Sequence, residues 1–248
     1  MNPIDEQFAQ WLTGFLEGDG TIGCYMCRQY KNPKWISQQI KVDFAQKEPT
    51  ILEYIHSTLG CGNFTHGQGT TRLAYQGKAR CIPLLGAFTK YIVSEHTRQQ
   101  LSTALKSLGI SAEPSTYPPT LDWIAGFWDA EGGSTLSASQ SSELYIKIYQ
   151  KDRKPLDAVR QFLDAGYILG YPNRNGEPMY SWIVSGHHAH DFGRLILPLT
   201  HSGEKRQKLT EYLNTYTTRL KVAVWMRSNP KHPIMTKVVD RMRTEHKQ

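Results

Sequence analysis

Residues 12–20 read LTGFLEGDG and residues 124–132 read IAGFWDAEG, so one chain contains two nonapeptides of nearly the same pattern. Each has helix-compatible apolar residues, a glycine at its third position, and an acidic residue directly before its final glycine. Because glycine commonly follows the end of a helix, Asp19 and Glu131 are expected where two helices end. The duplication suggests that the chain consists of two copies of one unit.

The similarity extends to the order of the predicted elements around each nonapeptide. In both copies the acid is followed by two strands, a helix opened by a proline (Pro49 or Pro155), two strands joined by a glycine-rich turn, and closing helices. This order predicts an α+β fold of two pseudo-symmetric αββαββα repeats. We place the first repeat at 1–110, a proline-rich linker at 111–119, the second repeat at 120–216, and a basic C-terminal extension at 217–248.

The composition is that of a globular protein that attracts polyanions. The chain of 248 residues has 29 Lys and Arg against 22 Asp and Glu, a formal net charge of +7, which favours nucleic acid or acidic lipid as a partner. The sequence lacks an apolar run of about 18 residues, and its first ten residues do not resemble a signal peptide. We expect an intracellular protein without a membrane partner, from an organelle (mitochondrion or chloroplast) or a prokaryotic cytoplasm.

Two groups of potential metal ligands, Cys24-x-x-Cys27 and His187-His188-x-His190, are better explained without a metal. The cysteines lie in a strand-like segment, where residues three apart point to opposite faces. The histidines follow a glycine turn at the start of a helix, and no second pair lies at a zinc spacing. We interpret the cysteines as isolated thiols in a reducing compartment.

Alternation in the predicted strands separates a core face from an outward polar face. In one strand the alternating apolar residues that should face the core are Ile40, Val42 and Phe44. In another strand they are Leu144, Ile146 and Ile148. Any solvated sheet face is polar, but a two-stranded ribbon with such side chains also fits a DNA major groove. The candidates for nucleic-acid contact are Thr21, Tyr25, Gln29, Ser37, Gln39, Lys41, Asp43, Arg72, Gln76, Thr135, Ser137, Ser139, Tyr145, Lys147, Tyr149, Asn173 and Arg174.

The two acids before the final glycines can share one site. Gly14 and Gly126 lack side chains, so the motif helices can pack backbone to backbone and bring their C-terminal ends together. Asp19 and Glu131 would then oppose the helix dipoles and repel each other, which requires a compensating cation. Their oxygens suit Mg²⁺ or a similar hard divalent ion, the usual partner of phosphodiester cleavage. Glu17 lies two residues before Asp19 and therefore faces elsewhere on the helix.

Both nonapeptides resemble the LAGLIDADG motif of homing endonucleases, and the element order from Phe8 to Thr217 resembles the single-chain, two-motif form of that family. The resemblance implies a saddle of two antiparallel sheets, packed through the motif helices, over a long asymmetric DNA duplex. It also implies a monomer that hydrolyses one phosphodiester in each strand with Mg²⁺ or Mn²⁺ and leaves short 3′ overhangs. Ca²⁺ is expected to bind without supporting cleavage.

The resemblance further implies roles for individual residues. Asp19 and Glu131 would bind metal, with the adjacent Gly18 and Ala130 completing the metal site. Glu17 and Asp129 would be structural and accept backbone hydrogen bonds at the interface formed by Gly14 and Gly126. The other catalytic candidates are Gln46 and Gln150, which would order water, Lys205, which would assist at the scissile phosphate, and Arg98, which follows Thr97 at the matching place in the first repeat.

Two alternatives keep the same fold without requiring cleavage. An RNA maturase would bind intron RNA to assist splicing, and a sheet-based transcription factor would bind duplex DNA. Neither needs Asp19 and Glu131 as a pair, so the presence of both acids favours the endonuclease, although a dual role stays open. The one-methylene difference between the two acids predicts unequal metal geometry and unequal cleavage rates for the two strands.

Overall fold

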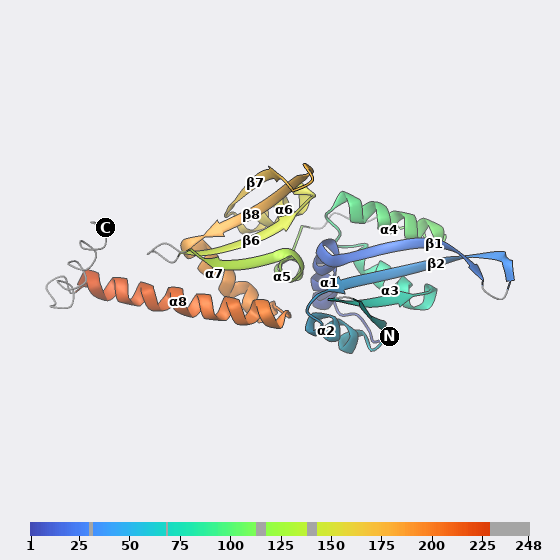
Figure 1. The fold of residues 1–248 in the computed structure, drawn as a ribbon, viewed down its shortest axis with the longest axis horizontal. Helices are drawn as coiled ribbons and strands as arrows, with labels where there is room; N and C mark the ends of the chain where they lie inside the picture. The colour runs from blue at the N-terminus through green and yellow to red at the C-terminus, as the bar shows by residue number, and fades with distance from the viewer. Residues whose placement is uncertain (30–31, 68, 113–117, 138–142, 229–248) are drawn as a thin grey trace.

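Each half of the chain folds into a four-stranded antiparallel sheet with helices packed against it, and the halves lie side by side (Figure 1). This computed structural model describes residues 1–29, 32–67, 69–112, 118–137 and 143–228. The two sheets have the same strand order, first–second–fourth–third within each repeat. The predicted α+β fold of two antiparallel repeats is confirmed.

The first repeat contains four helices and one sheet among its described residues. Its elements are α1 (Glu6–Asp19), β1 (Gly20–Gln29), β2 (Asn32–Gln46), α2 (Thr50–Leu59), β3 (Asn63–Gly67), β4 (Thr70–Gln76), α3 (Lys78–Phe88) and α4 (Glu95–Ser107). The sheet order is β1-β2-β4-β3. β1 and β2 form a hairpin that projects beyond the helices at one end of the molecule (Figure 1).

The second repeat follows the same order with a shorter first hairpin. Its elements are α5 (Leu121–Glu131), β5 (Gly132–Leu136), β6 (Leu144–Gln150), α6 (Arg153–Leu163), β7 (Tyr167–Pro172), β8 (Pro178–Ser185), α7 (Gly186–Ile196), the 3₁₀ turn Leu197–Leu199 and α8 (Gly203–Ser228). The sheet order is β5-β6-β8-β7. The closing segment of each repeat is a pair of helices. Helix α8 continues past residue 217, where we had placed the boundary between the second repeat and the C-terminal extension.

The ends of the motif helices follow from local chemistry. Asp5 and Thr120 are the N-cap residues of α1 and α5, and their side-chain oxygens accept hydrogen bonds from Phe8 N and Trp123 N. Gly132 follows the end of α5 with extended backbone, φ −84° and ψ 161°, and does not adopt the left-handed conformation of a typical C-cap glycine. Glycine is required there by space, because a Cβ would lie 2.1 Å from the Trp128 ring.

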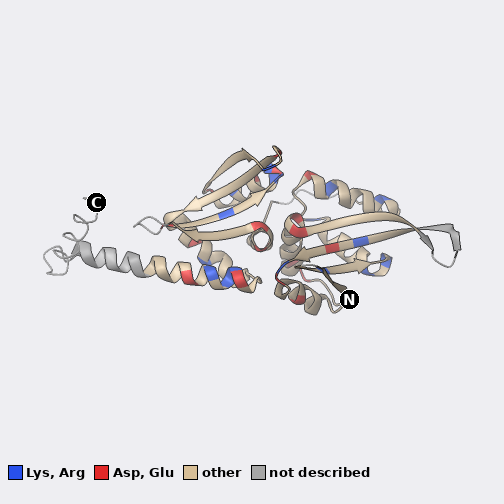
Figure 2. Ribbon diagram, viewed as in Figure 1, with Lys and Arg blue, Asp and Glu red and all other residues tan. Residues whose placement is uncertain are grey.

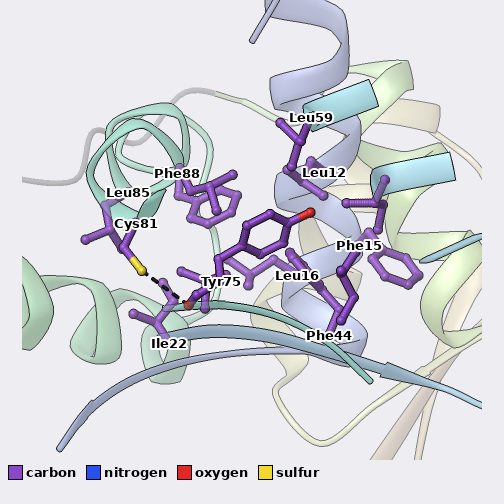
Figure 3. Packing of buried hydrophobic residues seen from close by; sticks show 14 of the residues in the cluster. Leu12, Phe15, Leu16, Ile22, Phe44, Leu59, Tyr75, Cys81, Leu85 and Phe88 are labelled. Atoms are coloured by element: carbon purple, nitrogen blue, oxygen red, sulfur yellow. Dashed lines mark hydrogen bonds between the residues drawn. The ribbon is translucent and has the colours of Figure 1, made fainter. Parts of the chain in front are cut away.

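The core lies between each sheet and its helices, as the strand alternation predicted. Ile40, Val42 and Phe44 are at most 3% exposed, and the core residues of β6 are fully buried. Figure 3 shows Phe44 and Tyr75 from the sheet packed against α1 and α3 in the first repeat. Burial of each such side chain stabilises the fold by about 1.5–3 kcal/mol, so this core fixes α1 on its sheet.

Some sequence expectations are shifted by the structure. Pro49 is the N-cap of α2, but Pro155 is the third residue of α6, whose N-cap is Asp152, so the prediction that Pro155 opens the helix is wrong by two residues. No disulfide links the four cysteines in the described part of the chain. Within the described ranges, no three His, Cys, Asp or Glu side chains cluster as metal ligands. The described helices include none with the length and apolar character needed to cross a membrane.

Candidate active site

The two motif helices α1 and α5 touch backbone to backbone at their glycines. A Cβ on Gly14 would lie 1.9 Å from the carbonyl oxygen of Trp123, and a Cβ on Gly126 would lie 1.9 Å from that of Trp11. Only a residue without a side chain allows this approach. The contact is reciprocal, so it relates the two repeats by a pseudo-two-fold axis.

This packing brings the C-terminal ends of α1 and α5 together. A Cβ on Gly18 would lie 2.3 Å from Ala130 Cβ and 2.8 Å from Glu131 Cγ. Asp19 and Glu131 both line a cleft of about 700 Å³, together with Gln46 and Lys205. Figure 2 shows acidic positions where the two helices end, beside the mixed charges on the first turns of α8.

The two acids share an electrostatic environment that disfavours their charged forms. Burial raises the pKa of Asp19 to about 6, against the opposing effect of Lys205. Burial, and then the charge of Asp19, raise the pKa of Glu131 to about 7. With two carboxylates and one ammonium ionised, the cluster carries an excess negative charge inside a basic protein, and a cation would relieve it.

Lys205 already supplies part of that positive charge. Its Nζ donates hydrogen bonds to the carbonyl oxygens of Trp128, Asp129 and Ala130 at 3.1, 2.6 and 2.8 Å. Burial lowers the pKa of Lys205, and the surrounding carboxylates oppose this effect. The lysine therefore caps the end of α5, where unpaired carbonyls and the helix dipole attract a cation. The carbonyl of Ala130 accepts from Lys205, and Ala130 lines the same cleft as the two acids, so its place in a metal site stays a prediction.

The other acid of each motif is structural in this arrangement. Asp129 accepts backbone hydrogen bonds from His201 N at 2.8 Å and Ser202 N at 3.4 Å, and Trp11 Nε1 donates to it at 3.2 Å. Glu17 accepts from the backbone of Val93 and Ser94 in the same way. Both acids thus anchor the segment that precedes the last helix of their own repeat.

These anchors identify Thr97 as the counterpart of Lys205. Ser94 Oγ accepts from Thr97 N at 3.1 Å, and Ser202 Oγ accepts from Lys205 N at 3.3 Å, so each residue stands three positions after its serine. Arg98 instead donates to the Ile92 carbonyl at 2.9 Å and lines a separate pocket with Pro118 and Phe162. Our assignment of Arg98 as a catalytic residue is therefore wrong, because it lies one position beyond the matching turn.

The two glutamines also differ in place. Gln46 at the end of β2 donates a hydrogen bond from Nε2 to Asp19 Oδ2, inside the cleft. Gln150 at the end of β6 donates from Nε2 to the Glu17 carbonyl at 3.1 Å, and its Oε1 accepts from Lys151 N at 2.7 Å. Gln150 thus binds a carbonyl near the end of α1, in the way that Lys205 binds those of α5, and neither of these two hydrogen bonds reaches Glu131.

Comparison with known families agrees with the duplicated motif. Residues 12–102 match the model described as LAGLIDADG endonuclease, and residues 118–197 match the model described as LAGLIDADG-like domain. The chain belongs to the LAGLIDADG family. It has the single-chain, two-motif form, because each repeat matches its own family model.

Solved LAGLIDADG structures share this fold over nearly the whole chain. The I-LtrWI homing endonuclease bound to target DNA has a TM-score of 0.64 at 12% identity, covering 95% of this chain and 96% of that one. I-GzeII in complex with its DNA target has a TM-score of 0.63 at 12% identity, covering 94% and 96%. I-SmaMI bound to cleaved DNA has a TM-score of 0.62 at 14% identity, covering 94% of each chain.

The outward faces of the two LAGLIDADG sheets differ in chemistry. In the first sheet Thr21, Tyr25, Gln39, Arg72 and Gln76 are exposed as predicted, while Lys41 and Arg72 bind Asp43 at 2.8 and 2.9 Å. Gln29 and Ser37 lie in β1 and β2, and Ser139 lies outside the described residues.

The outward face of the second sheet is rich in tyrosine. Thr135 is exposed, Ser137 is half-buried near the end of β5, and Asn173 and Arg174 lie in the β7–β8 turn. Tyr149 is 38% exposed, and the register places the exposed Tyr167, Leu169 and Tyr171 of β7 on the same face as Tyr145 and Lys147. These three β7 residues were not among the predicted contacts, although their period of two is visible in YILGYP.

Proposed function

We propose that this LAGLIDADG protein is a site-specific double-stranded DNA endonuclease that acts as a monomer and cuts one phosphodiester in each strand. The observation that carries the proposal is the meeting of one acid from each repeat, Asp19 and Glu131, in a single cleft between the two sheets. A site shared by two repeats suits a duplex whose two strands must both be cut. I-SmaMI, which shares this fold, has been described bound to cleaved DNA.

The sheets supply a surface for a long asymmetric target. The net charge of +7 favours phosphate contacts, and the outward Tyr25, Gln39 and Gln76 offer hydrogen-bonding groups to base edges. The second sheet offers mainly tyrosines and Lys147, so the two half-sites should be read by different chemistry. An asymmetric target sequence follows from this difference.

The cleft fits a divalent cation. Asp19 and Glu131 offer carboxylate oxygens and mutual repulsion, and water and DNA phosphate would complete the ligand set. Asp19 and Glu131 would hold Mg²⁺ or Mn²⁺, which would supply positive charge beside the phosphate and lower the pKa of a bound water. Ca²⁺ is expected to bind without supporting cleavage, and I-SmaMI has been described with uncleaved DNA in the presence of calcium ions.

The protein's own side chains orient this reaction. Gln46 holds the Asp19 carboxylate through its amide and can order a water beside it. The buried Lys205 ammonium lies beside both acids, where it can stabilise charge that develops on the phosphate oxygens. We propose that water attacks phosphorus and the P–O3′ bond breaks, leaving a 3′ hydroxyl and a 5′ phosphate, and that the two cuts are staggered to give short 3′ overhangs, as the resemblance to the family implies. The two half-sites are unequal, because equivalent positions in the two repeats differ or make different contacts: Thr97 and Lys205, Gln150 and Gln46, Asp19 and Glu131. We therefore expect the two DNA strands to be cut at unequal rates.

The proposal is tested by incubating the protein with a library of randomised DNA duplexes in Mg²⁺ or in EDTA and sequencing the new ends. We expect one recurrent asymmetric site, cut in both strands in Mg²⁺ and uncut in EDTA. If no duplex is cut while intron RNA binds tightly, the endonuclease proposal fails and the maturase alternative gains support. Binding that weakens with salt does not distinguish the two, because both depend on phosphate contacts.

Replacing Lys205 by Met should lower the cleavage rate by about 10²-fold, because removal of one donor that stabilises transition-state charge has an effect of this size. Arg98→Ala should change the rate by about threefold or less, because its guanidinium lies in a separate pocket. The check is single-turnover cleavage of the recovered duplex by both variants. A larger loss in Arg98→Ala than in Lys205→Met would contradict the structural match between Thr97 and Lys205.

The raised pKa values predict a stability change with pH in the metal-free protein. Because the pKa of Asp19 is raised to about 6 and that of Glu131 to about 7, these groups stabilise the fold fully below about pH 4. That contribution is lost as the pH rises through the folded-state values.

Glu131→Gln removes the charge responsible for part of this loss. In EDTA at pH 8 the variant should therefore unfold at a higher Tm than the wild type, by the equivalent of about 1 kcal/mol. The difference should nearly vanish at pH 4. Thermal unfolding at both pH values measures it, and a lower Tm for the variant at pH 8 would contradict the assignment.

A further inference from the structure

Glu48 joins the two repeats at the start of α8. It lies between β2 and α2 of the first repeat, yet its Oε2 accepts a hydrogen bond from Ser202 Oγ of the second repeat at 2.7 Å. Its Oε1 accepts from Glu204 N at 3.2 Å and from Thr50 Oγ1 at 2.7 Å. A carboxylate of the first repeat therefore caps the N-terminus of a helix in the second, where backbone N–H groups lack partners and the dipole favours negative charge.

This cap is linked directly to the lysine in the cleft. Ser202 Oγ donates to Glu48 and accepts from Lys205 N at 3.3 Å, so one hydroxyl connects the two residues. Lys205 then extends from the first turn of α8 to the end of α5. Although burial acts to raise the pKa of Glu48, hydrogen bonds from Thr50, Ser202 and Glu204 lower it. Glu48 is thus an ionised cap at neutral pH.

We propose that Glu48 is a positioning residue that acts across the repeat interface and places Lys205 beside the reacting phosphate. Both of its carboxylate oxygens are engaged by Thr50, Ser202 and Glu204, so a role as a further metal ligand is disfavoured. The catalytic part of this inference rests on the proposed endonuclease function. The structural part, the cap on α8, holds without DNA or metal.

The pseudo-symmetry of the chain provides a matched control. Asp152 stands two residues after Gln150, as Glu48 stands two residues after Gln46. Its Oδ2 accepts from Glu95 N at 3.1 Å, at the start of α4 in the first repeat, and its Oδ1 accepts from Lys154 N at 3.0 Å in its own repeat. Each repeat therefore caps the last helix of the other. The capped helix α4 carries Thr97 where α8 carries Lys205, so loss of the Asp152 cap leaves the lysine in place.

The test compares Glu48→Ala, Glu48→Gln and Asp152→Ala with the wild type in two measurements. Hydrogen exchange without DNA or metal follows the backbone amides of residues 202–206. Single-turnover cleavage of the recovered duplex gives the rate at saturating enzyme and the Kd in Ca²⁺. Glu48→Ala loses one helix cap, so Lys205 should be misplaced by a fraction of an ångström. The variant should therefore cleave about tenfold more slowly, while its Kd for the duplex in Ca²⁺ should change by about twofold or less.

The variants and controls separate positioning from general destabilisation. Glu48→Gln keeps an acceptor for the amide and should retain an intermediate rate. Asp152→Ala also removes the N-cap of α6, so it should lower the Tm at least as much as Glu48→Ala but lower the rate by about twofold or less. Faster exchange at residues 202–206 is expected in Glu48→Ala only.

An unchanged rate in Glu48→Ala, or an equal loss in Asp152→Ala, would overturn the inference. If the wild type cuts no duplex, the proposed function fails. The cap is then judged by exchange alone: unchanged protection at residues 202–206 rejects it, and lost protection supports it.

Discussion

Asp19→Asn or Glu131→Gln is expected to lower cleavage of both strands by about 10³-fold or more, because each would remove one of the two carboxylates that line the cleft and that we propose as metal ligands for both cuts. The loss should appear in the single-turnover rate at saturating protein. DNA affinity in Ca²⁺ should fall much less, because the proposed DNA contacts lie mostly on the two sheets. Strand-resolved gels of the recovered duplex measure both cuts at once.

Glu53→Gln is the matched control for these two substitutions, because Glu53 is an exposed acid on α2. It should cleave at the wild-type rate, which shows that loss of one negative charge alone is harmless. If Asp19→Asn stopped one strand and left the other at full rate, the metal site would be divided between the repeats and not shared. Full activity in either cleft variant would reject the assignment of these acids.

Gly126→Ala should cause a large loss of stability, because its Cβ would lie 1.9 Å from the Trp11 carbonyl oxygen and 3.0 Å from Phe15 N. These are backbone atoms of a helix held by its own core, so the two motif helices must separate. We expect a loss of about 3 kcal/mol or more, at the upper end of the range for overpacking. Urea unfolding with the m-value determined for each protein measures it.

Gly86→Ala is the control, because Gly86 lies inside helix α3 and a Cβ there would have nothing within 4 Å. Alanine is favoured over glycine in a helix by about 1 kcal/mol, so this variant should be slightly more stable than the wild type. Equal stability of Gly126→Ala and the wild type would mean that the helices do not pack as closely as described.

The fold was predictable from sequence because its signals repeat. Two glycine-containing helices, each followed by alternating strands, predicted the paired sheets, and the parity of Ile40, Val42 and Phe44 predicted the buried face. The backbone hydrogen bonds that Glu17 and Asp129 accept were expected from the resemblance of the two nonapeptides to the family motif. These features depend on local periodicity and on residue type, which the sequence displays directly.

Other parts of the site depended on contacts that the sequence does not display. Lys205 reaches three carbonyls at the end of α5 because the start of α8 returns to that helix within the second repeat. Arg98 was chosen for its charge, whereas the serine caps show that Thr97 occupies the equivalent position. Glu48 gave no signal, because its partners lie more than 150 positions away, at Ser202 and Glu204.

The most direct test of the shared site is anomalous diffraction from manganese in crystals of the protein bound to the recovered duplex. The account predicts an anomalous peak within coordination distance of both Asp19 and Glu131 and beside the scissile phosphates. A cleaving complex in which manganese lies elsewhere, or contacts one of these acids without the other, would contradict the claim that each repeat contributes one acid to a single metal site.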